Sequence, residues 1–211
     1  MRNHLRKLIY LSIFTVYFPA QAGSFEDWFL AIRQDKPTEI TSLLQRGFDP
    51  NAPDERGQLA LYLAMREGSF KVAEALLNHP DLRVDAANAA GETALMMAAL
   101  RGHLDWVKRL LQRGAQIERE GWTPLHYAAS GPGTPVVALL LDRGAKVDAL
   151  APNRSTPLLM AARYGAEETV DLLMARGANP RLRNDRGYNA ADFARLDGRE
   201  SLAARLDKLA R

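Results

Sequence analysis

The sequence contains no cysteine, which excludes disulfides, thiolate-bound metals and cysteine nucleophiles. Histidine is also scarce, and no two of the four histidines have the spacing of metal ligands. No Ser-His-Asp arrangement or recurring carboxylate pair is apparent. We therefore expect no catalytic residues, no metal-binding residues and no cofactor.

Long apolar runs are absent except at the N-terminus. There, three cations and no acid precede an apolar core at residues 8–18, and the small-residue motif AQA ends at Ala22. This order is typical of a signal peptide, so residues 1–22 are expected to be cleaved before Gly23. Eleven residues are too few to cross about 30 Å of hydrocarbon, so no stable membrane insertion is expected after cleavage. We expect a periplasmic protein of a Gram-negative bacterium, with secretion as the alternative.

An excess charge is lacking once this segment is removed. Three of the 28 basic residues and none of the 25 acidic residues lie in residues 1–22, so the remainder is formally neutral. The isoelectric point near 9.3 therefore belongs largely to the signal peptide. A neutral chain gives no electrostatic reason to expect nucleic acid or an anionic membrane as a partner.

What the sequence does contain is an internal repeat. Aligned segments place one capping position at Leu59, Thr93, Thr123, Thr156 and Asn189, at spacings of 34, 30, 33 and 33. Each unit has an alanine-rich first helix that begins after this position and a second helix with larger apolar residues that usually ends at glycine. One such helix pair cannot bury its apolar face alone, so the pattern predicts an all-α solenoid of stacked units.

The clearest unit reads GWTPLHYAA and then LLLDRGAKVDA, which resembles the ankyrin-repeat signature G-x-T-P-L-H-x-A-A and L-L-x-x-G-A. The resemblance extends from Arg56 to Leu209. It implies one ankyrin-repeat domain over residues 23–211, with about six helix-turn-helix units and short β-hairpin or loop fingers. Residues 24–51 keep only the second half of the pattern and are expected to form the N-terminal cap.

Two segments depart from the regular repeat. The connection from Gly114 to Thr123 is nine residues, whereas the one from Gly144 to Thr156 is twelve, so its finger is expected to be truncated. The segment SGPGTP, residues 130–135, looks superficially like a phosphate loop. A helix precedes it and no lysine follows, so it is interpreted as the turn between two helices.

His126 lies inside the signature. The resemblance implies that its ring bonds to a neighbouring backbone and ties one unit to the next. The alternative is a hydrolase that uses His126 together with a nearby acid.

The remaining candidate for function is the surface. In ankyrin arrays the hairpin tips and the exposed side of the first helices bind partners, usually on the concave face. By register, the corresponding partner-binding residues are Arg56, Gln58, Arg66, Glu92, Arg101, Arg119, Trp122, Arg154, Arg163, Tyr164, Arg186 and Tyr188. Arginine and aromatic side chains anchor protein interfaces. A solvated face is the alternative, because 22 of the 28 basic residues are arginine.

The sequence thus favours a non-catalytic protein-binding module that acts in the periplasm. A second hypothesis is an immunity protein that occludes a toxic periplasmic enzyme, for which we expect an acidic target surface. The chain also resembles small exported bacterial ankyrin-repeat proteins. Some of these are associated with periplasmic enzymes such as catalase, which implies that the partner is an enzyme.

Overall fold

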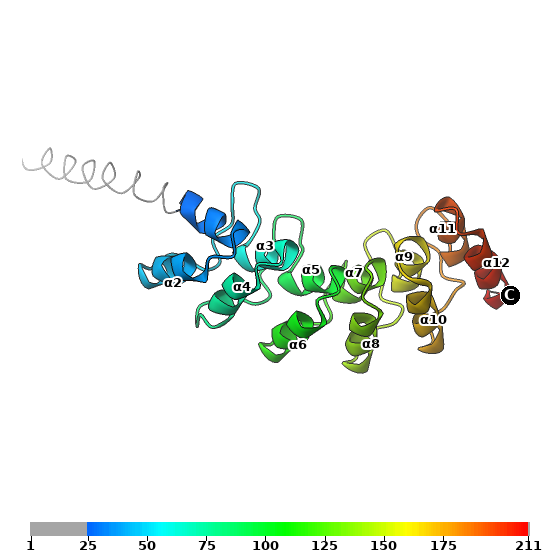
Figure 1. Cartoon of the computed structure of the whole chain (residues 1–211). Helices are drawn as coiled ribbons and strands as arrows, with labels where there is room; N and C mark the ends of the chain where they lie inside the picture. The colour runs from blue at the N-terminus through cyan, green and yellow to red at the C-terminus, as the bar shows by residue number, and fades with distance from the viewer. Residues whose placement is uncertain (1–24, 211) are drawn as a thin grey trace, which may run out of the picture. The chain divides into compact units, whose positions relative to one another are not determined.

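The structure is a computed structural model that describes residues 25–210. The predicted signal peptide, residues 1–22, lies outside the described residues. The described chain consists of short helices in consecutive pairs, and it divides into two compact units at Leu82 and Arg83 (Figure 1). Each unit is described separately below.

The first unit contains two helix pairs. Their bounds are residues 25–33, α2 (Pro37–Gln45), α3 (Ala60–Glu67) and α4 (Phe70–Leu77). Trp28 is fully buried and stacks on Phe48, with 4.6 Å between ring centroids. Asp35 accepts the backbone N–H of Val72 at 2.9 Å, which joins the first pair to the second. The N-terminal segment is therefore packed as a capping unit with its own aromatic core.

The second unit contains four helix pairs. The bounds are α5 (Ala94–Leu100), α6 (Leu104–Gln112), α7 (Pro124–Ser130), α8 (Thr134–Asp142), α9 (Pro157–Tyr164), α10 (Glu167–Ala175), α11 (Ala190–Leu196) and α12 (Glu200–Leu209). The first helices α5, α7, α9 and α11 pack successively on one another, and the second helices form another layer (Figure 1). The predicted all-α repeat fold is confirmed.

Local sequence explains the helix boundaries. The Thr93 hydroxyl accepts the Met96 N–H, and the Thr156 hydroxyl accepts the Leu159 N–H, both at 3.3 Å. These bonds satisfy amides that lack a partner at a helix start. Gly144 follows α8 with a φ of 92°, the left-handed conformation that glycine adopts at a helix end. The predicted caps at Thr93, Thr156 and Gly144 are therefore confirmed.

The segment SGPGTP is the turn predicted between two helices. α7 ends at Ser130, and α8 begins at Thr134. A Cβ atom at Gly131 would lie 2.2 Å from the carbonyl oxygen of Leu100 in the preceding pair. Glycine is thus required here by the close approach of two backbones, and the phosphate-loop interpretation has no structural basis.

The fingers between pairs differ as the sequence predicts. In four of them an amide donates to the carbonyl four residues later, as from Asp54 to Gln58 at 2.8 Å and from Ala151 to Ser155 at 2.9 Å. No such bond occurs in the connection of residues 115–122 in the described chain. The truncated finger is therefore confirmed.

Carboxylates also join successive pairs in the second unit. Each accepts a backbone N–H from the next connection: Asp85 from Gln116 (2.8 Å), Glu118 from Lys146 (2.9 Å) and Asp148 from Asn179 (3.1 Å). The repeated geometry sets the spacing between neighbouring connections.

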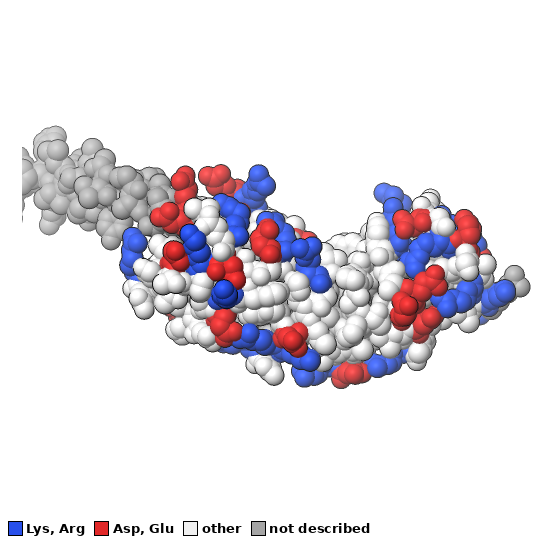
Figure 2. Space-filling model, viewed as in Figure 1, with Lys and Arg blue, Asp and Glu red and all other residues white. Residues whose placement is uncertain are grey.

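The last pair carries many paired charges. Figure 2 shows cations and anions side by side over this end of the chain. Ion pairs join Arg205 to Asp171 at 2.9 Å and Arg195 to Asp207. Arg199 differs from these arginines, because its Nη1 donates to the carbonyls of Ala161, Ala162 and Gly165 at 2.9 to 3.1 Å. It thereby satisfies the end of α9.

We expect Arg199→Ala to lower the free energy of unfolding by about 2 kcal/mol, because three partly buried carbonyls lose a charged donor. Arg205→Ala is the matched control, and its exposed ion pairs are worth at most about 1 kcal/mol. Urea unfolding of both variants measures the difference. Equal losses in the two variants would contradict the capping role.

Candidate functional site

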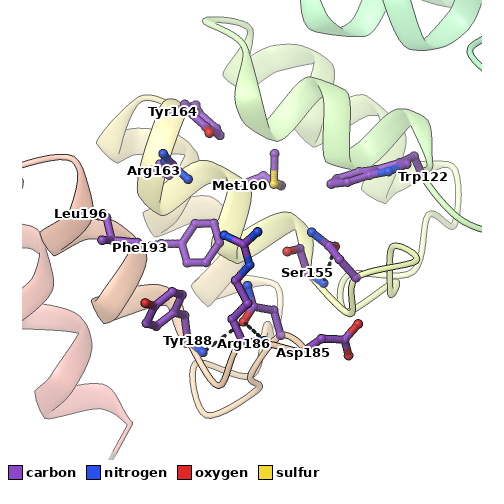
Figure 3. A pocket seen from close by; sticks show the side chains of 12 residues that line it. Trp122, Ser155, Met160, Arg163, Tyr164, Asp185, Arg186, Tyr188, Phe193 and Leu196 are labelled. Carbon is purple, nitrogen blue, oxygen red and sulfur yellow. Dashed lines mark hydrogen bonds between the residues drawn. The ribbon is translucent and has the colours of Figure 1, made fainter. Parts of the chain in front are cut away.

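A pocket of about 290 Å³ opens on the second unit where the fingers meet the first helices (Figure 3). Its lining comes from α9, α11, the two fingers that precede them, and Trp122. The lining residues are Trp122, Asn153, Ser155, Met160, Arg163, Tyr164, Asn184, Asp185, Arg186, Tyr188, Phe193 and Leu196. The volume is near the lower end of the range for ligand pockets and suits one or two side chains.

Backbone bonds fix the two fingers that form one wall of this pocket. The Asp185 N–H donates to the Asn153 carbonyl at 3.1 Å, which joins the finger tips. The Asn184 side-chain oxygen accepts the N–H groups of Arg186 and Tyr188, both at 3.0 Å. This polar turn holds the last finger in one conformation and presents the side chains of Arg186 and Tyr188.

Arg163 and its aromatic neighbours form the opposite side. The Arg163 guanidinium lies 4.9 Å from the Tyr164 ring centroid and 5.6 Å from that of Phe193. Tyr188 packs edge-on against Phe193 at 6.2 Å. Arg163 makes no hydrogen bond or ion pair with any described residue, and its Nε is buried. Cation–π contacts thus hold the guanidinium while its N–H donors stay unused.

The charge of the lining is positive. Its one carboxylate, Asp185, lies 3.8 Å from Arg154 at the rim. Arg186 is exposed, and its side chain has no ion pair among the described residues. In Figure 3 the Arg186 guanidinium reaches up beside the Phe193 ring. Two unpaired guanidinium groups therefore face this pocket.

His126 lies beneath Trp122, with 5.3 Å between ring centroids. Its Nδ1 accepts the Thr123 N–H at 3.2 Å, so the proton is on Nε2, which donates to the Ser155 carbonyl at 3.0 Å. The ring is fully buried, and desolvation lowers the pKa of His126 to about 4. His126 ties one repeat to the next, as the resemblance implied. A buried neutral ring with both nitrogens bonded offers no base to a substrate, which argues against the hydrolase interpretation of His126.

The predicted partner-binding residues separate into groups. Five line the pocket: Trp122, Arg163, Tyr164, Arg186 and Tyr188. Arg154 is at its rim, through the contact with Asp185. Glu92, Arg101 and Arg119 lie elsewhere in the second unit, and Glu92 accepts the Tyr127 hydroxyl at 2.9 Å. Arg56, Gln58 and Arg66 are in the first unit, where Arg66 pairs with Glu67 at 2.7 Å.

Sequence reasoning missed the apolar floor of the pocket. Met160 and Phe193 each lie four residues after the capping position of their unit, and Leu196 lies seven residues after it. The seventh position had already been recognised as exposed at Arg163. The signal was therefore present in the register, but the sequence analysis named no apolar residue at these positions.

Two kinds of feature are absent from the described part of the chain. Residues 25–210 contain no cluster of three or more His, Cys, Asp or Glu side chains able to hold a metal ion. In the same range, no helix has the length and apolar character needed to span a bilayer.

Comparison with known proteins agrees with this architecture. The family model for ankyrin repeats (3 copies) matches residues 28–120, 82–151 and 116–184. The nuclear factor NF-kappa-B p105 subunit of Gallus gallus is 32% identical over 74% of this chain and 16% of its own length. The B-cell lymphoma 3 protein homolog of Mus musculus is 33% identical over 74% of this chain and 36% of its own length. This chain thus spans well under half of these relatives.

One chain of a solved structure is similar to this chain over nearly all of its own length. The structure is that of a predatory endopeptidase from Bdellovibrio bacteriovorus in complex with an immunity protein. The match has a TM-score of 0.72 and 28% identity, and it covers 86% of this chain and 97% of the other. The repeat spacing, the stacked helix pairs and the matching family model together establish that this chain belongs to the ankyrin-repeat family.

Proposed function

We propose that this chain is a non-catalytic binding protein that acts in the periplasm and captures a partner protein through the concave face predicted from sequence. The observation that carries the proposal is the pocket of the second unit, which brings together Trp122, Arg163, Tyr164, Arg186 and Tyr188. Large aromatic and arginine side chains around a depression are typical of interface hot spots. The twelve residues predicted from register remain candidate contacts, and these five are the ones that line the pocket.

Exposed apolar surface supports this choice of centre. Six large hydrophobic side chains in the described chain are exposed, and three of them, Tyr164, Tyr188 and Leu196, line this pocket. Apolar surface exposed around one depression is a common mark of a binding site. The other three lie apart from the pocket lining, so the concentration is local.

A more specific candidate is an immunity protein that occludes a toxic periplasmic enzyme. The solved complex of an endopeptidase with an immunity protein favours this candidate, because the match covers 97% of the similar chain in that complex. The candidate requires that the captured partner be an enzyme whose activity falls when this chain is added. A partner without enzymatic activity would refute the immunity role and leave the binding role intact.

Affinity capture from a periplasmic extract, with the chain from Gly23 onward as bait, tests the binding role. We expect Trp122→Ala combined with Arg154→Ala to reduce recovery of the partner at least about tenfold, since both changes remove contact surface at the pocket and its rim. The melting temperature should fall by only a few degrees, because Arg154 is exposed and Trp122 is half-buried.

A control variant combines Arg143→Ala with Leu209→Ala. It also removes one arginine and one large apolar side chain, but from exposed positions at the ends of second helices. Capture by this control should equal that of the unmodified chain. The proposal fails if the control loses the partner as fully as the pocket variant, or if the pocket variant retains it.

A further inference from the structure

The pocket also indicates the chemistry of the segment that enters it. We infer that it binds a partner segment in which a large apolar side chain stands next to a carboxylate. The apolar side chain lies on Met160, Phe193 and Leu196, and the carboxylate bonds to Arg163 and Arg186. This inference rests on the proposed function and deepens it by naming the recognised group.

The first argument is the state of Arg163. Its guanidinium is fixed between Tyr164 and Phe193, is half-buried, and has no acceptor among the described residues. A buried N–H donor without an acceptor costs free energy, which a bound acceptor restores. Because the planar guanidinium matches a carboxylate in a two-bond geometry, a carboxylate is the group that best satisfies it.

The second argument is the charge around Arg163. Arg186 brings a second unpaired guanidinium to the same pocket, and the only lining acid, Asp185, is near Arg154. No lining carboxylate is therefore free to neutralise either arginine. An anionic group is attracted here, and a cationic one is repelled.

The third argument is the apolar floor. Met160 from α9 and Phe193 and Leu196 from α11 supply the apolar lining, and the 55% exposure of Leu196 leaves apolar surface to be covered (Figure 3). A free small anion would leave this surface in water. A pocket of about 290 Å³ has room for one large side chain beside the carboxylate, but not for a whole helix.

Blocked synthetic peptides test this inference without knowledge of the partner. One probe has adjacent leucine and glutamate between glycines. A second replaces the glutamate with glutamine, and a third replaces the leucine with alanine. A fourth has no acidic side chain and ends in leucine with a free carboxylate. The fourth probe distinguishes an internal acidic side chain from a chain terminus as the source of the carboxylate.

Binding is followed by NMR of the isotope-labelled chain from Gly23 onward, with the indole N–H of Trp122 as reporter. We expect the glutamate or the free-terminus probe to bind about tenfold more tightly than the glutamine probe. Arg186→Gln should reduce that ratio, because one of the two guanidinium groups that bind the carboxylate is lost. Arg143→Gln, which removes an exposed arginine on the second-helix side, should leave the ratio unchanged.

Binding of the glutamate and free-terminus probes no tighter than that of the glutamine probe, or no shift at Trp122 with any probe at millimolar concentration, overturns the inference. The inference is also overturned if the alanine probe binds as tightly as the first probe, which has leucine next to glutamate. The proposed function is judged separately by partner capture. If the partner still depends on Trp122 while the probes show no carboxylate preference, the binding role stands and the inferred chemistry is wrong.

Discussion

Replacement of Gly131 with alanine should lower the free energy of unfolding by about 3 kcal/mol or more, the upper range for forced overpacking. The new methyl group would stand 2.2 Å from the Leu100 carbonyl oxygen, which belongs to the backbone of the preceding first helix and cannot move alone. The stacked pairs must then separate, and the fully buried alanines between them lose their contacts. Urea unfolding measures this loss.

Gly144→Ala provides the decisive comparison. Gly144 has a φ of 92°, which disfavours alanine, but no atom lies within 4 Å of the added methyl. We expect a loss of about 1 kcal/mol there. Gly131 has an ordinary φ of −100°, so backbone conformation alone predicts the opposite order. A larger loss for Gly144→Ala would contradict the claim that repeat spacing determines the effect.

Stability should also depend on pH through His126. Its pKa is lowered from 6.5 to about 4 in the folded chain, because burial disfavours the charged ring. Above pH 6.5 both states are neutral, and the folded chain has its full stability. As the pH falls toward 4, the unfolded chain takes up a proton that the folded chain refuses. About 3 kcal/mol of stability is then lost over this range.

The variant His126→Gln isolates this effect from the titration of carboxylates. It cannot titrate, so the difference in unfolding free energy between the unmodified chain and the variant should shrink by about 3 kcal/mol from pH 7.5 to pH 4. A His126→Gln difference that is the same at both pH values would show that the ring titrates normally in the folded chain.

Much of the fold was predictable because its determinants are local. A threonine precedes the first helices α5, α7 and α9, and a glycine follows the second helices α6, α8 and α10, so these boundaries can be predicted locally. The spacing of 30 to 34 residues indicates stacking. The contacts between repeats were less accessible. The bond from the Lys146 N–H to Glu118 joins residues 28 positions apart, and nothing near Glu118 in the sequence distinguishes it from a solvated surface acid.

The candidate site was predicted only in part, for a related reason. The positions of Trp122 and Arg186 within their repeats predict that both are exposed. They do not predict which exposed side chains lie close together in the fold. Convergence depends on the finger bond from Asp185 to Asn153 and on the absence of a regular finger beside Trp122. Glu92 and Arg66 have the same register character, yet each is engaged by a neighbouring side chain.

The central claim is that a partner protein binds at the pocket of the second unit, and crosslinking tests it most directly. A photoreactive amino acid is placed singly at Trp122, at Arg186 or at Arg143, and each chain is irradiated in a periplasmic extract. Our account predicts that positions 122 and 186 crosslink to the same protein and that position 143 does not. A crosslink that is strongest from position 143, or a partner that is captured without a crosslink from 122 or 186, would contradict it.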